Sequence, residues 1–304
     1  DEDFEAAVHA AVDAAHDDER VRAVLERLLA RVVAPGWSNA LAAKLLSLVP
    51  LPDPGFGSLL WQAFVGCWPA SRDRLHGYAE KAMREAGDRT TWTEPDAAYE
   101  EAVHAAVDAA YDDLEVRSVV DALVARIAAP GWSNSLSAKV VALTMPGVPD
   151  VYQGSELWEQ SLVDPDNRRP VDFAVRRGVL ERVRAGERPV LTPSLDDRGD
   201  AKLLVTQAAL TLRRDRPELF TTYAPLTAHG TAASHALAFD RGGALTVATR
   251  LPVGLEAHGW GDTVLPLPDG AWTDLFTGRE HTGDAQVGQL LAAYPVALMI
   301  RVSS

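Results

Sequence analysis

The sequence is poor in cysteine, in basic residues and in long apolar runs, and each shortage excludes a class of protein. Cys67 is the only cysteine among 304 residues, so no disulfide can form within the chain, which fits a reducing compartment such as the cytoplasm. Its neighbours in FVGCW favour a buried structural thiol over a nucleophile. The acidic start, DEDFEAAVHA, has no features of a signal peptide, and no apolar run is long enough to span a bilayer.

The charge balance is acidic. Lys and Arg number 29 against 43 Asp and Glu, which gives a formal net charge of -14. Nucleic acid and anionic membrane both favour basic patches, so neither is an expected partner. A neutral sugar is unaffected by this charge, and the charge also serves solubility. Apolar residues make up 47% of the chain, enough for a sizeable core. The start also lacks an initiator Met, which suggests a piece of a longer protein.

An internal repeat is the clearest large-scale feature. The sequence AAVHAAVDAAHDDERVRAVLERLLARVVAPGWSNALAAKLLSL recurs, with changes, from Glu101 as EAVHAAVDAAYDDLEVRSVVDALVARIAAPGWSNSLSAKVVAL. Two copies separated by a different segment favour partial gene duplication over a solenoid. Each copy predicts two helices, the first from the helical spacing of Val103, Val107 and Ala110. The Pro-Gly pair of APGWSN predicts a loop, after which Ser-Asn can cap a further helix.

The remaining elements follow from periodicity and breakers. Residues Gly57 to Ala86 predict two helices interrupted near Pro69. The apolar run from Val141 to Tyr152, punctuated by Gly and Pro, predicts a buried strand. Amphipathic helices are expected over Gly178 to Arg184 and over Ala201 to Arg214.

The last quarter of the chain has the sequence pattern of a β-domain. HALAFD and ALTVATR flank the turn RGG and predict a hairpin, and TVLPLP, AWTDLF and PVALMIRV predict further strands. We therefore expect an antiparallel β-domain of sandwich type. The predicted domains are a duplicated helical unit (1–52), a helical region with one strand (53–222) and the β-domain (223–304).

Polar and aromatic side chains are concentrated in PGVPDVYQGSELWEQSLVDPDNRRPVDF, from Pro146 to Phe173. A strand that ends in such a loop is how a barrel presents ligand-binding groups. Trp and Tyr can pack on a sugar ring, while Asp, Asn and Arg can bond to its hydroxyls. Alternatively, the two arginines pair with Asp164 and Asp166 and hold the loop in shape. The candidate site residues are Tyr152, Gln153, Glu156, Trp158, Asp164, Asp166, Asn167, Arg168 and Arg169.

Other constellations do not indicate chemistry. Four histidines are scattered through the β-region without metal-ligand spacing: His229, His235, His258 and His281. There is no phosphate-binding loop, dinucleotide fingerprint or nucleophile elbow. Trp37 and Trp132 belong to the repeat loop, where packing is favoured over sugar stacking.

The segment from Pro146 to Phe173 resembles the strand 8 region of maltooligosyl trehalose synthases, in the α-amylase superfamily. The pattern G-x-P-x-x-Y-x-G-x-E is shared across that superfamily, whereas SLVDPDNRRPVDF is much more specific to the synthases. The stretch LLWQAFVGCWPASRDRLHGYAEKAMREAGDRTTWTEPDAAYE and the ending LRRDRPELF before a β-domain are similar as well. The resemblance covers about residues 53 to 304.

This resemblance implies a fold and an activity. The fold is α+β: a mostly helical body carrying the last strand/helix unit of an incomplete (β/α)8 barrel, followed by an antiparallel β-sandwich. The activity is intramolecular glucosyl transfer by a (1->4)-α-D-glucan 1-α-D-glucosylmutase, which turns the reducing-end α-1,4 bond of a maltooligosaccharide into an α,α-1,1 bond. Such chemistry uses three carboxylates and requires no metal or organic cofactor.

The chain departs from that family in two respects. The family's catalytic carboxylates precede its helical region, and residues 1–52 hold the duplicated helical unit instead. No catalytic residue is therefore assigned, the chain alone is expected to be inactive, and the nine candidates would shape the acceptor side of the cleft. Missing strands would leave apolar edges that favour self-association. Two alternatives stay open: an α-glucan hydrolase using Glu156 with Asp164 or Asp166, and a non-catalytic glucan-binding remnant.

Overall fold

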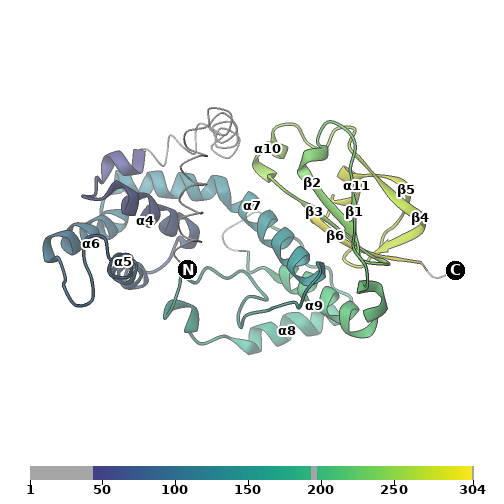
Figure 1. The fold of residues 1–304 in the computed structure, drawn as a ribbon, viewed down its shortest axis with the longest axis horizontal. Coiled ribbons are helices and arrows are strands. Elements are labelled where there is room, and N and C mark those ends of the chain that lie inside the picture. The colour runs from purple at the N-terminus through teal and green to yellow at the C-terminus, as the bar shows by residue number, and fades with distance from the viewer. Residues whose placement is uncertain (1–43, 193–196, 303–304) are drawn as a thin grey trace, which may run out of the picture. The chain divides into compact units, whose positions relative to one another are not determined.

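The computed structural model of the chain describes residues 44–192 and 197–302 (Figure 1). The chain divides into two compact units, one up to Leu123 and one from Val124 onward. The boundary falls inside a long helix, α7 (Leu114–Thr144). Most of the first copy of the repeat, with its predicted helices and Trp37, lies outside the described residues.

The first unit is helical, with α4 (Pro54–Cys67), α5 (Arg72–Ala86) and α6 (Ala97–Asp112). The predicted helix pair with a break near Pro69 is confirmed. Helix α4 begins where the Asp53 carboxylate accepts bonds from the first free N–H groups of the helix. Cys67 is 2% exposed, as expected of a structural thiol.

The second copy of the repeat supplies α6 and α7. Val103, Val107 and Ala110 are fully buried along one face of α6, so the predicted helix is confirmed. The predicted loop at the Pro-Gly pair is wrong, because α7 continues through Pro130. A proline inside a helix costs about 3 kcal/mol.

Buried side chains on both sides of Pro130 explain why α7 does not break there. The helix buries two sets of apolar residues: Val116, Val120 and Val124 before the proline, and Leu136, Val140 and Leu143 after it. Burying one such side chain contributes about 1.5–3 kcal/mol, so the combined burial exceeds the cost of the proline. The Ser-Asn pair of the repeat therefore lies inside α7 rather than at a cap.

The predicted strand from Val141 to Tyr152 is also wrong. Val141 to Thr144 form the last turn of α7, and the residues after them up to Tyr152 adopt bends and irregular backbone. A buried strand must bond to a neighbouring strand. No described strand pairs with this segment, and Val148 is 95% exposed. The final barrel strand expected from the resemblance is therefore not formed among the described residues.

The second unit contains two further helices, α8 (Phe173–Arg184) and α9 (Asp200–Asp215), which lie side by side (Figure 1). Both were predicted from amphipathic patterns. The Asp172 carboxylate caps α8 by accepting from Ala174 and Val175. The buried faces of α7, α8 and α9 share one apolar core with one face of the sheet.

All six described strands form one antiparallel sheet in the order β1-β2-β3-β6-β4-β5. They are β1 (Ala224–Leu226), β2 (Ala236–Asp240), β3 (Ala244–Thr249), β4 (Val264–Asp274), β5 (Glu280–Gln286) and β6 (Val296–Arg301). Short helical turns complete the described fold: η1 (Asp166–Arg168), η2 (Pro217–Phe220), η3 (Ala233–His235), α10 (Pro252–Glu256) and α11 (Val287–Leu290).

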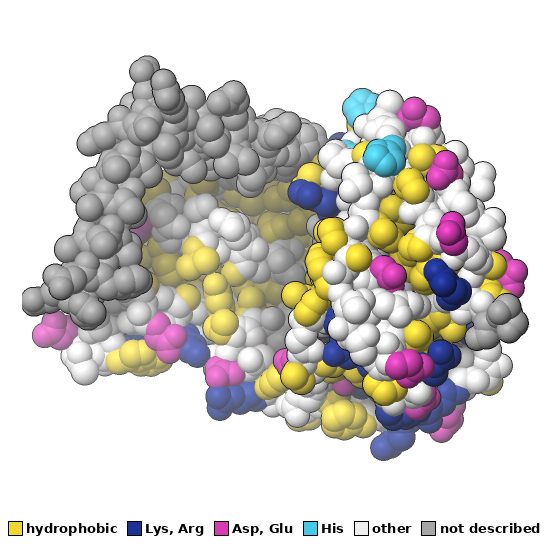
Figure 2. Space-filling view, turned by 45° about the vertical axis from the view of Figure 1, so that its right-hand side comes forward, with side chains coloured by type: hydrophobic (Ala, Val, Ile, Leu, Met, Phe, Trp, Pro, Cys, Tyr) yellow, Lys and Arg dark blue, Asp and Glu magenta, His cyan; other side chains and the backbone are white. Residues whose placement is uncertain are grey.

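The predicted hairpin is confirmed as β2 and β3, but the predicted sandwich is not confirmed. Two predicted strands, TVLPLP and AWTDLF, are one long strand with a bulge between Pro266 and Ala271. The sheet is buried on both faces, although the described residues form no second sheet: one face joins the helical core, and the other covers a second cluster that includes Val287 and Leu290 of α11. Acidic and basic side chains are intermingled over its described surface in Figure 2.

Candidate functional site

The predicted site loop connects α7 to α8 and is held by ion pairs of its own. Arg168 pairs with Asp164. Arg169 Nε lies 3.1 Å from Asp166 Oδ1, and the other oxygen of Asp166 accepts a 2.7 Å bond from the Leu162 N–H. The alternative in which both arginines hold the loop in shape is therefore confirmed.

Glu156 fastens the start of this loop to α8. Its Oε2 lies 3.0 Å from Arg176 Nε, and both side chains are largely buried. Arg176 also donates to the carbonyls of Gly154 (2.6 Å) and Asp172 (3.1 Å). One guanidinium thus joins both ends of the loop.

Trp158, one of the nine predicted residues, lines a pocket beside α7. Its indole is stacked on Trp132 of α7, with ring centroids 4.5 Å apart and planes 9° apart. Its Nε1 donates to Asp197 Oδ1 at 3.0 Å. Gly199, at φ 87°, passes so close that a Cβ there would lie 2.8 Å from the Trp158 ring. Trp158 is therefore held in place by its neighbours. Trp132, which stacks on it, also lines the pocket.

The pocket beside this tryptophan pair measures about 320 Å³. It is lined by Trp132, Leu157, Trp158, Gln160, Asp172, Val175, Arg176, Asp197 and Arg198. An indole beside carboxylates, an amide and guanidinium groups is a lining that suits a polar ligand with flat apolar faces, such as a sugar. Of the nine predicted residues, Trp158 lines it.

The other predicted residues do not converge on this pocket. Tyr152 is 48% exposed and Gln153 is exposed. Asn167 turns its amide oxygen into the protein, where it has no hydrogen-bond partner in the described structure. Trp132, Asp172 and Asp197 were missed by sequence reasoning. They come from separate elements, so no single motif contains them. Trp132 was noticed only as part of the repeat loop, and that stretch is helical in the structure.

Two lysine amines, one buried and one half-buried, lie beneath the site, and sequence reasoning missed them as well. Lys202 of α9 is 7% exposed, and its Nζ lies 5.7 Å from the Trp158 ring centroid. Burial, with a smaller contribution from Lys139, lowers the pKa of Lys202 to about 8. Lys139 of α7 donates to Ser155 Oγ at 3.3 Å, and burial lowers its pKa also.

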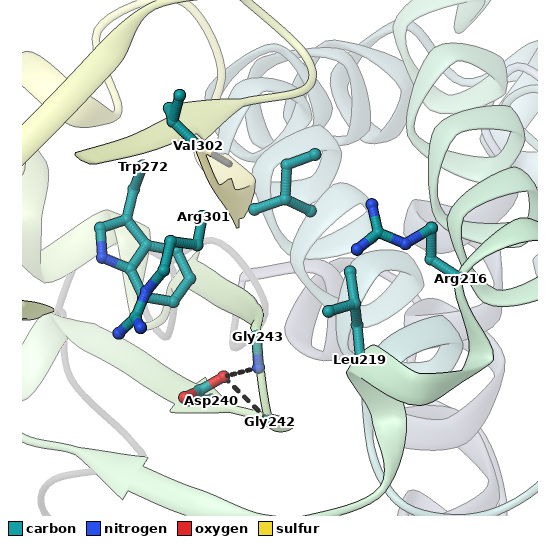
Figure 3. A pocket seen from close by; sticks show the side chains of 9 residues that line it. Arg216, Leu219, Asp240, Gly242, Gly243, Trp272, Arg301 and Val302 are labelled. Atoms are coloured by element: carbon teal, nitrogen blue, oxygen red, sulfur yellow. Dashed lines mark hydrogen bonds between the residues drawn. The ribbon is translucent and has the colours of Figure 1, made fainter. Parts of the chain in front are cut away.

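A second pocket, of about 380 Å³, lies between the sheet and the turn after α9 (Figure 3). Arg216 and Leu219 border one side, and Arg301 borders the other above Trp272, its guanidinium 5.4 Å from the ring centroid. Asp240 accepts from two glycine N–H groups of the hairpin turn. None of the nine predicted residues lines this pocket, and Trp272 is too deeply buried to stack on a ligand.

Within residues 44–192 and 197–302, His, Cys, Asp and Glu side chains form no group of three or more with the geometry of a metal site. In the same part of the chain, no helix has both the length and the apolarity to cross a bilayer.

Known proteins are similar in sequence to most of this chain. The putative maltooligosyl trehalose synthase of Mycobacterium tuberculosis is 43% identical to it over 296 residues, which cover 94% of this chain and 37% of that protein. The resemblance to maltooligosyl trehalose synthases is confirmed. The alignment covers a larger share of the chain than residues 53–304 do, so it extends into the first 52 residues. No family model matches.

Solved structures of maltooligosyl trehalose synthases also match the fold. That of the enzyme from Arthrobacter ramosus superimposes with a TM-score of 0.84 at 49% identity, covering 88% of this chain and 35% of that one. A hypothetical maltooligosyl trehalose synthase of Sulfolobus tokodaii gives a TM-score of 0.67 at 24% identity, which shows the fold alone. The chain thus spans little more than a third of the length of the synthases it matches.

Proposed function

We propose that this chain is part of an enzyme that isomerises the reducing-end α-1,4 bond of a maltooligosaccharide to the α,α-1,1 bond of trehalose. The observation that carries this proposal is the identity of 43% and 49% to two synthases over most of the chain. The reaction is intramolecular glucosyl transfer, the activity of a (1->4)-α-D-glucan 1-α-D-glucosylmutase. Part of a synthase that shapes a glucan cleft is expected to present sugar-binding groups, and the tryptophan-lined pocket supplies them.

The chain alone is proposed to be inactive. Retaining transfer needs two carboxyl groups about 5–5.5 Å apart and free to react. Glu156, Asp164 and Asp166 are each engaged by an arginine in the described structure. These pairs also argue against the α-glucan hydrolase alternative, which would use the same three side chains.

The nine predicted residues are proposed to shape the acceptor side of the glucan cleft, in three groups. Trp158 would position Trp132, whose indole would pack on a glucose ring, with Asp172 and Asp197 accepting bonds from hydroxyls. The ion-paired residues would hold the loop that borders the pocket, namely Glu156, Asp164, Asp166, Arg168 and Arg169. The exposed Tyr152 and Gln153, and Asn167 in the same loop, would complete this border.

A non-catalytic glucan-binding remnant is the second candidate, and the same pocket favours it. A reducing-end assay on maltohexaose, with chromatography of the products, separates the two candidates from the hydrolase. We expect no change with the chain alone. Loss of reducing ends without release of glucose would show that the chain is an isomerase by itself, and gain of reducing ends would show a hydrolase.

Replacing Trp132 tests the pocket directly. Isothermal titration of the chain with maltohexaose is expected to show binding, and Trp132→Ala is expected to weaken it about tenfold, since stacking on an aromatic ring and its buried area are lost. Trp92→Ala is the matched control, because Trp92 is 58% exposed and does not line the pocket. Equal affinity of both variants would remove Trp132 from the site.

Finer features follow from the family likeness and are proposed with it. The last strand/helix unit of an incomplete (β/α)8 barrel belongs to this proposal, and its strand would form only where neighbouring strands are present to bond with it. The domain limits at 52 and 222 and the sandwich character of the β-domain belong to the same proposal. The single cysteine is the reason to propose the cytoplasm as the location.

A further inference from the structure

A groove of about 450 Å³ lies between α8 and α9. One stripe of each helix lines it, at spacings of three and four residues that keep side chains on one face. The stripe of α8 is Phe173, Arg177, Leu180 and Arg184, and that of α9 is Leu203, Gln207, Leu210 and Arg214. Glu156, Arg176, Thr206 and Thr211 complete the lining.

The floor of this groove is apolar and open to solvent. Phe173 is 50% exposed and Leu210 is 36% exposed, and Leu180 and Leu203 pack against the core beneath them. Covering such side chains with an apolar group removes them from water, which is favourable. The groove therefore favours a ligand with an apolar body.

The rim of the groove is basic in a chain whose net charge is -14. Arg176 is engaged by Glu156, and Arg214 lies 2.6 Å from Asp215. Arg177 and Arg184 have no ion pair anywhere in the described part of the chain. The Arg182–Asp200 pair, at 2.7 Å, joins the end of α8 to the start of α9, so the helices run antiparallel. Arg184 and Arg214 therefore lie toward opposite ends of the groove, and Arg177 lies between them.

We propose that this groove binds a small anion with an apolar body, such as a medium-chain carboxylate. The carboxylate would meet the planar donor fork of Arg177. The body would lie along Leu180, Leu203 and Leu210. The volume is within the range of small-molecule sites. A docked polypeptide would need roughly 800 Å² from each partner, which four apolar side chains do not supply.

Isothermal titration of the full chain with decanoate, below its micelle concentration, tests this site. We expect saturable binding of one decanoate per chain and much weaker binding of 1-decanol, which lacks the charge. Arg177→Gln is expected to weaken decanoate binding about tenfold, because one charge-assisted pair is lost. Arg177→Lys is expected to retain part of the affinity, and Leu210→Gln is expected to weaken binding with all four arginines intact.

Arg250→Gln is the matched control, because Arg250 is exposed and does not line the groove. Thermal unfolding monitored by circular dichroism verifies that each variant is folded. Absence of saturable binding, equal binding of 1-decanol, or an Arg177→Gln variant with unchanged affinity would overturn the proposal. So would sedimentation showing a dimer that Leu210→Gln dissociates, since the groove would then be a contact between copies. Glucan binding and turnover do not enter these measurements, so this result is independent of the proposed function.

Discussion

Several ionisable side chains of this protein lie in buried or partly buried surroundings that the sequence pattern does not predict. Lys202 and Lys139 occupy positions that look like ordinary helix residues, yet both amines lie beneath the site loop. Two histidines on neighbouring helices, His76 and His104, meet with their Nδ1 atoms 2.7 Å apart. Each case predicts a measurable dependence of stability on protonation.

Lys202→Met is expected to stabilise the chain at pH 7, by about 1–3 kcal/mol, because it removes the cost of burying a charge. The pKa of Lys202 is lowered in the folded state to about 8, so the unfolded chain binds the proton more tightly. The native protein therefore gains stability as pH rises from about 8 toward 10.5, and the advantage of the variant shrinks over that window. Urea denaturation at pH 7 and pH 10 measures both effects. Lys81→Met, in the first unit, provides the control.

The His76–His104 pair predicts a loss of stability in mild acid. A 2.7 Å contact between two Nδ1 atoms requires one ring to donate and the other to accept, so both rings cannot be fully protonated. Burial, and then the neighbouring His76, lower the pKa of His104, although Glu80, Glu100 and Asp108 act in the opposite direction. The unfolded chain consequently binds the proton more readily, and stability falls as pH drops below about 6.5.

Urea denaturation at pH 7.5 and pH 5.5 measures this loss. His104→Gln is expected to reduce the difference between the two pH values, whereas His258→Gln, in the β-domain, is expected to leave it unchanged. An identical pH dependence in all three proteins would contradict the role given to the pair.

Among the secondary structure elements, α7 shows most clearly how burial overrides a local signal. A Pro-Gly pair is a strong loop signal, and the helix nevertheless continues through Pro130. The sheet shows the same principle: β3 is buried at all six positions because helices cover one face and a second apolar cluster covers the other. A strand buried on both faces has an apolar sequence like that of a strand inside a sandwich, although all described strands join one sheet.

Pro130→Ala is expected to stabilise the chain by about 1–3 kcal/mol, since it restores a backbone N–H donor and removes the clash of the ring with the preceding turn. Urea denaturation followed at the helical circular dichroism signal measures this. Pro146→Ala, in the irregular backbone beyond α7, is the matched control and should change stability little. A destabilised Pro130→Ala variant would mean that the proline is required where it stands.

At the scale of the whole molecule, exposed apolar residues predict self-association. Val148 is 95% exposed at the start of the site loop, and Val190 is 83% exposed after α8. Covering a side chain as exposed as these with a second copy of the chain would remove its apolar surface from water, which is favourable. Sedimentation velocity over a range of protein concentrations is expected to show self-association that Val148→Ser reduces. Leu251→Ser, at a 56% exposed position in the β-domain, serves as the control, and a monomer at all concentrations would refute the prediction.

The sequence alone determined those features whose signals are local or carried by an extended specific motif. Amphipathic spacing is enough to specify α6, α8 and α9, since each buries one face whatever its neighbours are. The Gly-Gly turn between two strand-like runs specifies the β2–β3 hairpin. The similarity to maltooligosyl trehalose synthases could also be recognised from the sequence, because SLVDPDNRRPVDF is long and specific. The pairing of Arg168 and Arg169 with nearby aspartates was foreseen as an alternative, since all four lie in one short segment.

Only the tertiary structure decided the features that depend on residues far apart in the chain. Val141 to Tyr152 has the composition of a buried strand, but a strand exists only where another backbone bonds to it. Pro130 stays in a helix because burial on both sides outweighs its local cost. The pocket beside Trp132 and Trp158 draws on α7, the site loop and the approach to α9, so no single stretch of sequence contains it. Local patterns encode faces and turns, whereas contacts between distant segments decide which of those faces meet.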